Sequence, residues 1–75
     1  MTYDDNLIRM ANQIGTFFES MPDRPEALEG IAIHLKKFWD PRMRHAFLAL
    51  VDGTHGSEAS EIVRAAVRAH RDSIQ

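Results

Sequence analysis

Residues 34–44 read His34-Leu35-Lys36-Lys37-Phe38-Trp39-Asp40-Pro41-Arg42-Met43-Arg44, and they join two predicted helices. Proline disfavours a helix that runs through the residue before it, so Asp40 and Pro41 separate the two segments. The Asp40 side chain can accept hydrogen bonds from the unpaired amides of the second helix, and Pro41 suits its first position. These residues therefore predict a fixed corner between two helices.

Apolar side chains on both sides of this corner recur every three or four residues, which is the spacing of one helical face. The run before the corner follows Asp23, a predicted N-cap with Glu26 three residues later. Its members are Leu28, Ile31, Ala32, Leu35, Phe38 and Trp39. The run after the corner consists of Met43, Phe47, Leu50 and Val51. Gly30 costs about 1 kcal/mol relative to alanine inside a helix, so it indicates close approach of a neighbouring helix.

Two further runs with helical spacing lie toward the ends of the chain. The first, expected to be capped by Asp4 or Asp5 and ended by Pro22, comprises Leu7, Ile8, Ala11, Ile14, Phe17, Phe18 and Met21. The last, expected to be capped by Ser57 after a loop at 52–56, comprises Ala59, Ile62, Val63, Ala66, Val67, His70 and Ile74. Strand-like alternation is missing, so residues 1–75 predict an all-α fold: a small single-domain bundle of about four short helices.

Composition narrows the function classes. The 75 residues have a mass of 8.6 kDa, which suits one small domain. The sequence has no cysteine, which excludes disulfides, thiolate-bound iron–sulfur clusters and thiolate zinc sites. Its N-terminus lacks the basic and apolar regions of a signal peptide, and its apolar runs are too short to span a bilayer. A net charge of −2 is unlike the strongly basic domains that bind nucleic acids.

Catalytic and metal-binding motifs are also missing from the sequence. The four histidines do not form an i, i+4 pair on one helix, and no serine lies in a G-x-S-x-G elbow. Gly53 and Gly56 are not followed by the Gly-Lys-Ser/Thr of a phosphate-binding loop. We therefore predict no enzyme activity, no metal site and no cofactor in this chain.

Positive charge is concentrated around the corner. Residues 31–45 carry a net charge of +3, whereas 1–30 carry −4 and 46–75 carry −1. Three interpretations remain open: a solvated junction over core aromatics, a protein-docking patch, and a phosphate or nucleic-acid site. The candidate partner-binding residues are His34, Lys37, Phe38, Trp39, Arg42, Met43 and Arg44.

The docking interpretation depends on exposure. If Phe38 and Trp39 are partly exposed at the corner, they can anchor in a partner's pocket while Arg42 and Arg44 form charged hydrogen bonds. In that case Trp39→Ala weakens partner binding and leaves the isolated chain helical.

The segment from His34 to Arg44 resembles the signature of one family, the delta subunits of NAD-dependent, molybdenum-containing formate dehydrogenases. The resemblance continues upstream in Arg9-Met10-Ala11-Asn12-Gln13-Ile14, in Phe17-Phe18 and in Gly30-Ile31-Ala32. It covers roughly residues 7–50. From Gly53 onward the similarity is limited to a helical tail that contains alanine and valine.

The resemblance implies a small, cofactor-free subunit with a structural or assembly role. The larger formate dehydrogenase subunits would carry the molybdenum cofactor, iron–sulfur clusters and FMN. They would oxidise formate to carbon dioxide and reduce NAD in the cytoplasm. Two alternatives stay open, a transient chaperone-like factor for cofactor insertion or complex maturation, and a small nucleic-acid-binding module. The sequence does not determine whether the chain self-associates.

Overall fold

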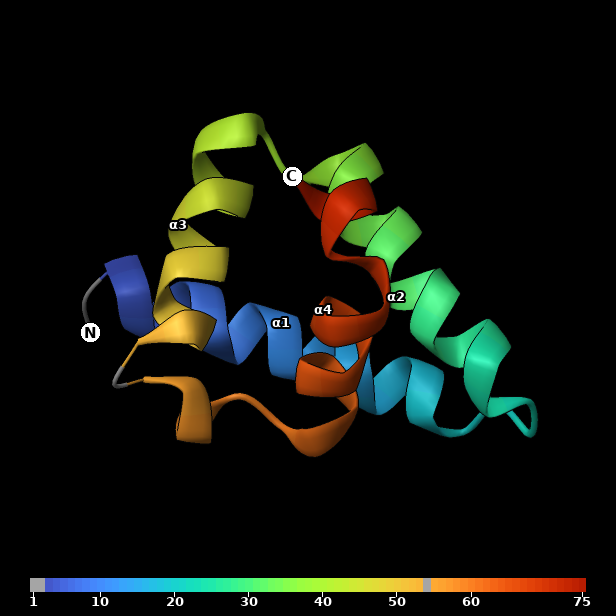
Figure 1. The fold of residues 1–75 in the computed structure, drawn as a ribbon. Coiled ribbons are helices and arrows are strands. Elements are labelled where there is room, and N and C mark those ends of the chain that lie inside the picture. The colour runs from blue at the N-terminus through green and yellow to red at the C-terminus, as the bar shows by residue number, and fades with distance from the viewer. Residues whose placement is uncertain (1–2, 54) are drawn as a thin grey trace.

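The computed structural model describes residues 3–53 and 55–75 and contains four α-helices within them (Figure 1). They are α1 (Tyr3–Glu19), α2 (Arg24–Phe38), α3 (Pro41–Asp52) and α4 (Glu61–Ile74), with a short 3-10 helix, η1 (Gly56–Glu58), before α4. No strand occurs among the described residues. The predicted all-α class, with about four short helices, is confirmed.

Helix α4 packs most extensively against α2, and α1 crosses below both (Figure 1). The C-terminal end of α4 lies beside the end of α2, where the chain turns into α3 (Figure 1). The C-terminal end of α4, which is distant in sequence, therefore lies against the corner at 39–41 between α2 and α3.

The corner forms as its residues predict. Asp40 has an extended backbone, and its Oδ1 accepts a hydrogen bond of 2.9 Å from the amide of Met43. Pro41 occupies the first helical position of α3. Trp39 is also extended, and its amide donates to the carbonyl of Leu35, which ends α2 at Phe38. Local capping chemistry thus specifies where α2 ends and α3 begins.

The other helix boundaries match the sequence in part. Asp23 caps α2 as predicted, with its Oδ1 3.1 Å from the amide of Glu26. Helix α1 begins at Tyr3, which places Asp4 and Asp5 in its first turn rather than at the predicted N-cap; their side chains lie outside the described part. The helix ends at Glu19, and the amide of Met21 donates to Phe18 in the following turn.

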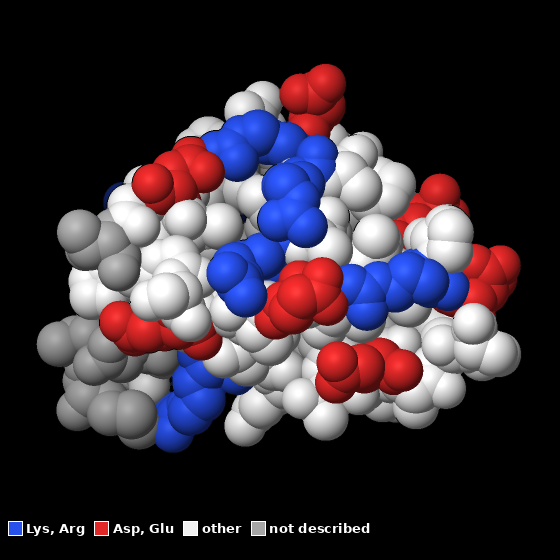
Figure 2. Space-filling model, turned by 60° about the horizontal axis from the view of Figure 1, so that its bottom comes forward, with Lys and Arg blue, Asp and Glu red and all other residues white. Residues whose placement is uncertain are grey.

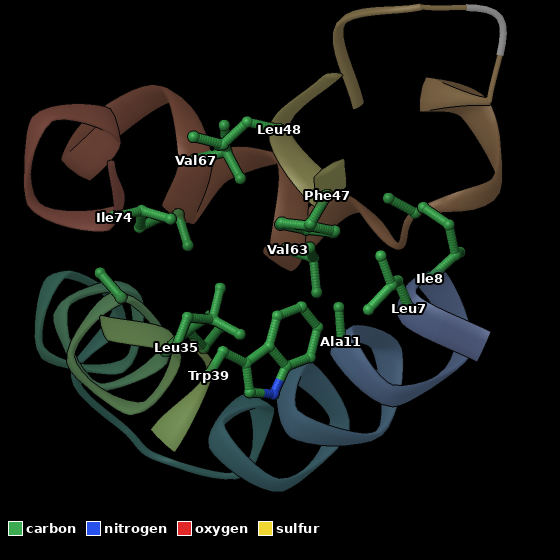
Figure 3. Close-up of a cluster of buried hydrophobic side chains, with 14 of the residues drawn as sticks. Leu7, Ile8, Ala11, Leu35, Trp39, Phe47, Leu48, Val63, Val67 and Ile74 are labelled. Carbon is green, nitrogen blue, oxygen red and sulfur yellow. The ribbon is translucent and has the colours of Figure 1, made fainter. Parts of the chain in front are cut away.

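The four helices share one core (Figure 3). Leu7, Ala11, Leu35, Phe47 and Val63 are each no more than 1% exposed. The indole of Trp39 packs edge-on against Phe47, with ring centroids 5.6 Å apart. Since a chain of this size has a thin core, one buried tryptophan contributes a large share of its apolar burial.

Gly30 allows the close helix contact that the sequence predicts. A Cβ added at this position would lie 2.5 Å from Cε1 of Phe18, so the Phe18 ring packs directly over the glycine. Gly15 plays the same part between α1 and α4, because a Cβ there would lie 2.8 Å from Cγ2 of Val63. The predicted close approach at Gly30 is confirmed, and α1 is the neighbour.

The predicted start of the last helix is wrong. Ser57 lies in η1, and α4 is preceded by Ser60 at the N-cap position. Asn12 of α1 explains the shift, since its Nδ2 donates to the carbonyl of Glu58 at 3.0 Å and its Oδ1 accepts from the amide of Ser60 at 2.8 Å. A side chain from another helix thereby supplies the cap that local sequence assigned to Ser57.

Candidate docking surface

Arg44 is a structural residue, although the sequence placed it among the candidate partner-binding residues. Its side chain is only 8% exposed. Its Nε donates to the carbonyl of Ile74 at 2.8 Å, and its Nη1 donates to the carbonyls of Trp39 at 2.6 Å and Lys36 at 3.3 Å. These oxygens belong to the ends of α4 and α2, where unpaired carbonyls and the helix dipoles favour a cation.

Trp39 does not meet the condition of the anchor hypothesis, because it is only 5% exposed. The partial exposure expected for Trp39 is therefore wrong, and Trp39→Ala is instead expected to destabilise the fold. Phe38, one residue earlier, is 70% exposed, and Met43 is half-buried against the core. Of the two adjacent aromatics, only Phe38 is available as a protruding anchor.

A groove of about 470 Å³ runs between α1 and α2, and we call it the α1/α2 groove. It is lined by Met10, Gln13, Ile14, Phe17, Phe18, His34 and Trp39. Trp39 reaches it from the core, while Phe18 lies over Gly30. Its lining contains no carboxylate, so the groove offers a partner mainly apolar and aromatic contact.

The exposed apolar side chains lie on the same two helices. Among the described residues, four large hydrophobic side chains are more than a third exposed, and all belong to α1 or α2. They are Met10 at 37%, Phe17 at 72%, Ile33 at 53% and Phe38 at 70%. The His34 ring lies 4.8 Å from that of Phe38, centroid to centroid. Met10 and Phe17 line the groove and Phe38 contacts its His34, so three of the four lie at or beside it, and exposed apolar patches mark interaction sites on soluble proteins.

Sequence reasoning found the α2 side of this surface and missed the α1 side. The sequence places Phe17 in a single apolar stripe of the first helix, whereas its side chain is 72% exposed in the structure. A signal was present in the sequence: Met10, Ile14, Phe17 and Met21 form a second apolar stripe at spacings of four, three and four. Two adjacent apolar stripes on one helix indicate that the helix makes apolar contacts on two of its sides.

The cationic side chains around the corner differ in whether they form hydrogen bonds within the described residues. Lys36 Nζ donates to the carbonyl of Gln75 at 2.7 Å, and Arg44 is buried as described. Lys37 and Arg42 are exposed and make no hydrogen bond or ion pair with the described residues. The positive block therefore presents two unengaged cations at its surface, a small footprint for a polyanion.

Elsewhere the charges are mixed. On the face shown in Figure 2, basic and acidic side chains are interspersed. Arg24 Nη2 contacts both carboxylate oxygens of Glu61, at 2.6 and 2.7 Å, and Arg71 pairs with Asp52. The hydrogen bond from Arg24 lowers the pKa of Glu61 below its ordinary value, with further help from nearby arginine charges. This face lacks the single-sign field typical of nucleic-acid binders.

A family model matches residues 6–67, and its description is "NADH-dependant formate dehydrogenase delta subunit FdsD". The chain belongs to this family. The resemblance inferred from the corner and from α1 is confirmed, and the match extends into α4. Comparisons with curated proteins and with solved structures found no match.

The segment from His34 to Arg44 has two roles in this fold. Asp40, Pro41 and Arg44 build the corner and secure the ends of α2 and α4. His34 and Trp39 line the α1/α2 groove. Within the described residues, no cluster of three or more histidine, cysteine or acidic side chains is placed to hold a metal ion. None of the described helices is long and apolar enough to cross a membrane.

Proposed function

We propose that this chain is a non-catalytic structural subunit of a cytoplasmic NAD-dependent formate dehydrogenase complex. The observation that carries the proposal is the exposure of Met10, Phe17 and Phe38 at or beside an apolar groove between α1 and α2. A 75-residue chain has few apolar residues to spare from its core. Their presence at the surface is accounted for if a larger subunit covers them.

Redox chemistry is assigned to the partners in this proposal. The larger subunits carry the molybdenum cofactor, the iron–sulfur clusters and FMN, and they couple formate oxidation to reduction of NAD. Two of the buried or half-buried polar side chains have structural partners within the described residues. Arg44 binds the carbonyl ends of two helices, and Asn12 holds the turn before α4.

The test is co-expression of the tagged chain with the larger subunits, followed by purification on the tag. We expect the subunits to elute in fixed stoichiometry, with bound metal and formate-dependent NAD reduction. Recovery of only metal-poor, inactive larger subunits would identify a transient assembly factor instead. Recovery of the chain alone would overturn the proposal.

A further inference from the structure

We infer that the α1/α2 groove holds an amphipathic helix of a larger formate dehydrogenase subunit, with apolar side chains in the groove and carboxylates against Lys37 and Arg42. This inference rests on the proposed function and specifies the surface and the chemistry of the partner.

The shape of the groove favours a helix as its occupant. The lining residues Met10, Ile14, Phe17 and Phe18 come from α1, and His34 and Trp39 come from the α2 side. A cleft between two helices is the usual seat of a third helix, whose side chains at i, i+3/i+4 and i+7 enter it as anchors. Phe17 and Phe38 protrude at its edges, where they can pack against the flanks of that helix.

Charge specifies the polar side of the partner. Lys37 lies one residue before Phe38 and three after His34, and Arg42 follows Trp39 by three residues at the corner. Both cations lack partners among the described residues, and the groove lining has no acidic side chain to serve them. Carboxylates on the bound helix would form ion pairs with these two cations and would fix the register of that helix.

A second copy of this chain is a poorer occupant. In a symmetric dimer each copy could offer the facing groove only single protruding side chains such as Phe17 and Phe38, not a continuous apolar ridge. A head-to-tail contact would need an apolar ridge elsewhere on the molecule. Among the described residues, the exposed large hydrophobic side chains lie only on α1 and α2, so α3 and α4 offer no such ridge.

Photo-cross-linking in the co-expressed complex tests the identity of the occupant. Phe17 or Phe38 is replaced by the photoreactive analogue benzoylphenylalanine, and exposed Ala69 of α4 is the control position. We expect irradiation at 17 and 38 to join this chain to one segment of a larger subunit, with helical apolar spacing and with Asp or Glu. Position 69 should not label that segment. Cross-links between two copies of this chain, or to a segment without carboxylates, would overturn the inference.

Charge reversal tests the electrostatic part. Lys37→Glu combined with Arg42→Glu should reduce recovery of the larger subunits at least tenfold, whereas Arg68→Glu on α4 should leave it unchanged. Equal recovery for the two variants would overturn the assignment of carboxylates. If the wild-type chain co-purifies but residues 17 and 38 give no cross-link to a larger subunit, the docking site is wrong and the proposed function stands. If the wild type fails to co-purify, both fail.

Discussion

Phe38 and Trp39 are neighbours in sequence, yet one side chain points into solvent and the other into the core. The difference arises because α2 ends between them, so Trp39 takes an extended backbone and turns its indole back toward Phe47. Phe38 keeps the direction of the last helical turn and lies beside His34. Of these neighbouring aromatics, one thus belongs to the core and the other to the proposed docking surface.

Trp39→Ala should strongly destabilise the isolated chain. Removing a buried tryptophan leaves a cavity and costs about 3–5 kcal/mol, which is a large fraction of the stability of a small domain. Circular dichroism with urea titration would show this as loss of helicity or a much lower midpoint. Phe38→Ala is the matched control, and its exposed ring should cost no more than about 0.5 kcal/mol. Equal midpoints for the two variants would contradict the assignment of Trp39 to the core.

Arg44 illustrates a buried cation without a carboxylate. Its guanidinium is surrounded by main-chain oxygens from two helix ends, and each hydrogen bond is charge-assisted. The planar fork of arginine suits several acceptors at once, a geometry that the single ammonium of lysine cannot reproduce.

Arg44→Met should therefore lower the free energy of unfolding by about 2–4 kcal/mol, because buried carbonyls lose their donor. Arg44→Lys should recover less than half of that loss. Arg42→Met, two residues away and exposed, is the control and should stay within about 0.5 kcal/mol of wild type. The measurement is chemical denaturation of the isolated variants, and a midpoint for Arg44→Met that equals wild type would contradict the structural role.

The corner could be predicted from sequence, and the role of Arg44 could not. Asp40 and Pro41 act on amides within three residues, so their chemistry is fully local. Arg44 binds Ile74, thirty residues away, and that acceptor is brought near only by the packing of α4. Counting Arg44 among exposed cations followed from its charge alone, since sequence carries no direct record of burial by distant helices.

At the scale of helices, the start of α4 is determined by a contact with α1. Ser57 has the residue type of an N-cap, and Glu58 and Glu61 suit a first turn, so the local pattern supports an early start. The Asn12 side chain instead binds Glu58 and Ser60 and holds the segment between them in a turn. Sequence reasoning missed the α1 side of the groove for a related reason. The two apolar stripes of α1 are adjacent, and they look like a single stripe when the helices that pack against α1 are unknown.

Asn12→Ala should uncouple this turn from α1. It removes a donor to the Glu58 carbonyl and an acceptor for the Ser60 amide, a loss of about 1–3 kcal/mol. Asn12→Asp should not restore the loss, because a carboxylate cannot donate to the carbonyl of Glu58. Hydrogen exchange at the Ser60 amide would report the change locally. Gln13→Ala is an exposed neighbouring control, and protection of Ser60 that survives in Asn12→Ala would contradict the assignment.

For the molecule as a whole, the ion pairs and the exposed apolar side chains lie on different parts of the surface. Ion pairs join elements away from the groove: Arg24 with Glu61 links the starts of α2 and α4, and Arg71 with Asp52 links α4 to the end of α3. Exposed pairs of this kind are screened by water and contribute little individually. The α1/α2 groove has exposed apolar side chains along it, and Lys37 and Arg42, at the end of α2 and the start of α3, have no such partners among the described residues. The ion pairs thus lie away from the exposed apolar side chains of the proposed docking site.

The Glu61 pair predicts the sign of a pH effect on this fold. The hydrogen bond from Arg24, aided by the charges of Arg68 and Arg64, lowers the pKa of Glu61 in the folded chain despite some desolvation. A lowered folded pKa means that the carboxylate stabilises the fold above the unfolded pKa, about 4.3 for a free glutamate. This contribution is lost as the pH falls through the lower folded pKa.

Thermal unfolding of wild type and Glu61→Gln from pH 7 to pH 3 checks this prediction. We expect wild type to have the higher midpoint at pH 7, and the gap to close toward pH 3 as Glu61 becomes protonated. Arg24→Gln should reproduce the same pattern because it removes the other partner, and 1 M salt should narrow the gap at pH 7 by screening. A gap that stays constant from pH 7 to pH 3 would mean that the ionised carboxylate does not stabilise the fold. The two helix starts would then be joined by packing alone.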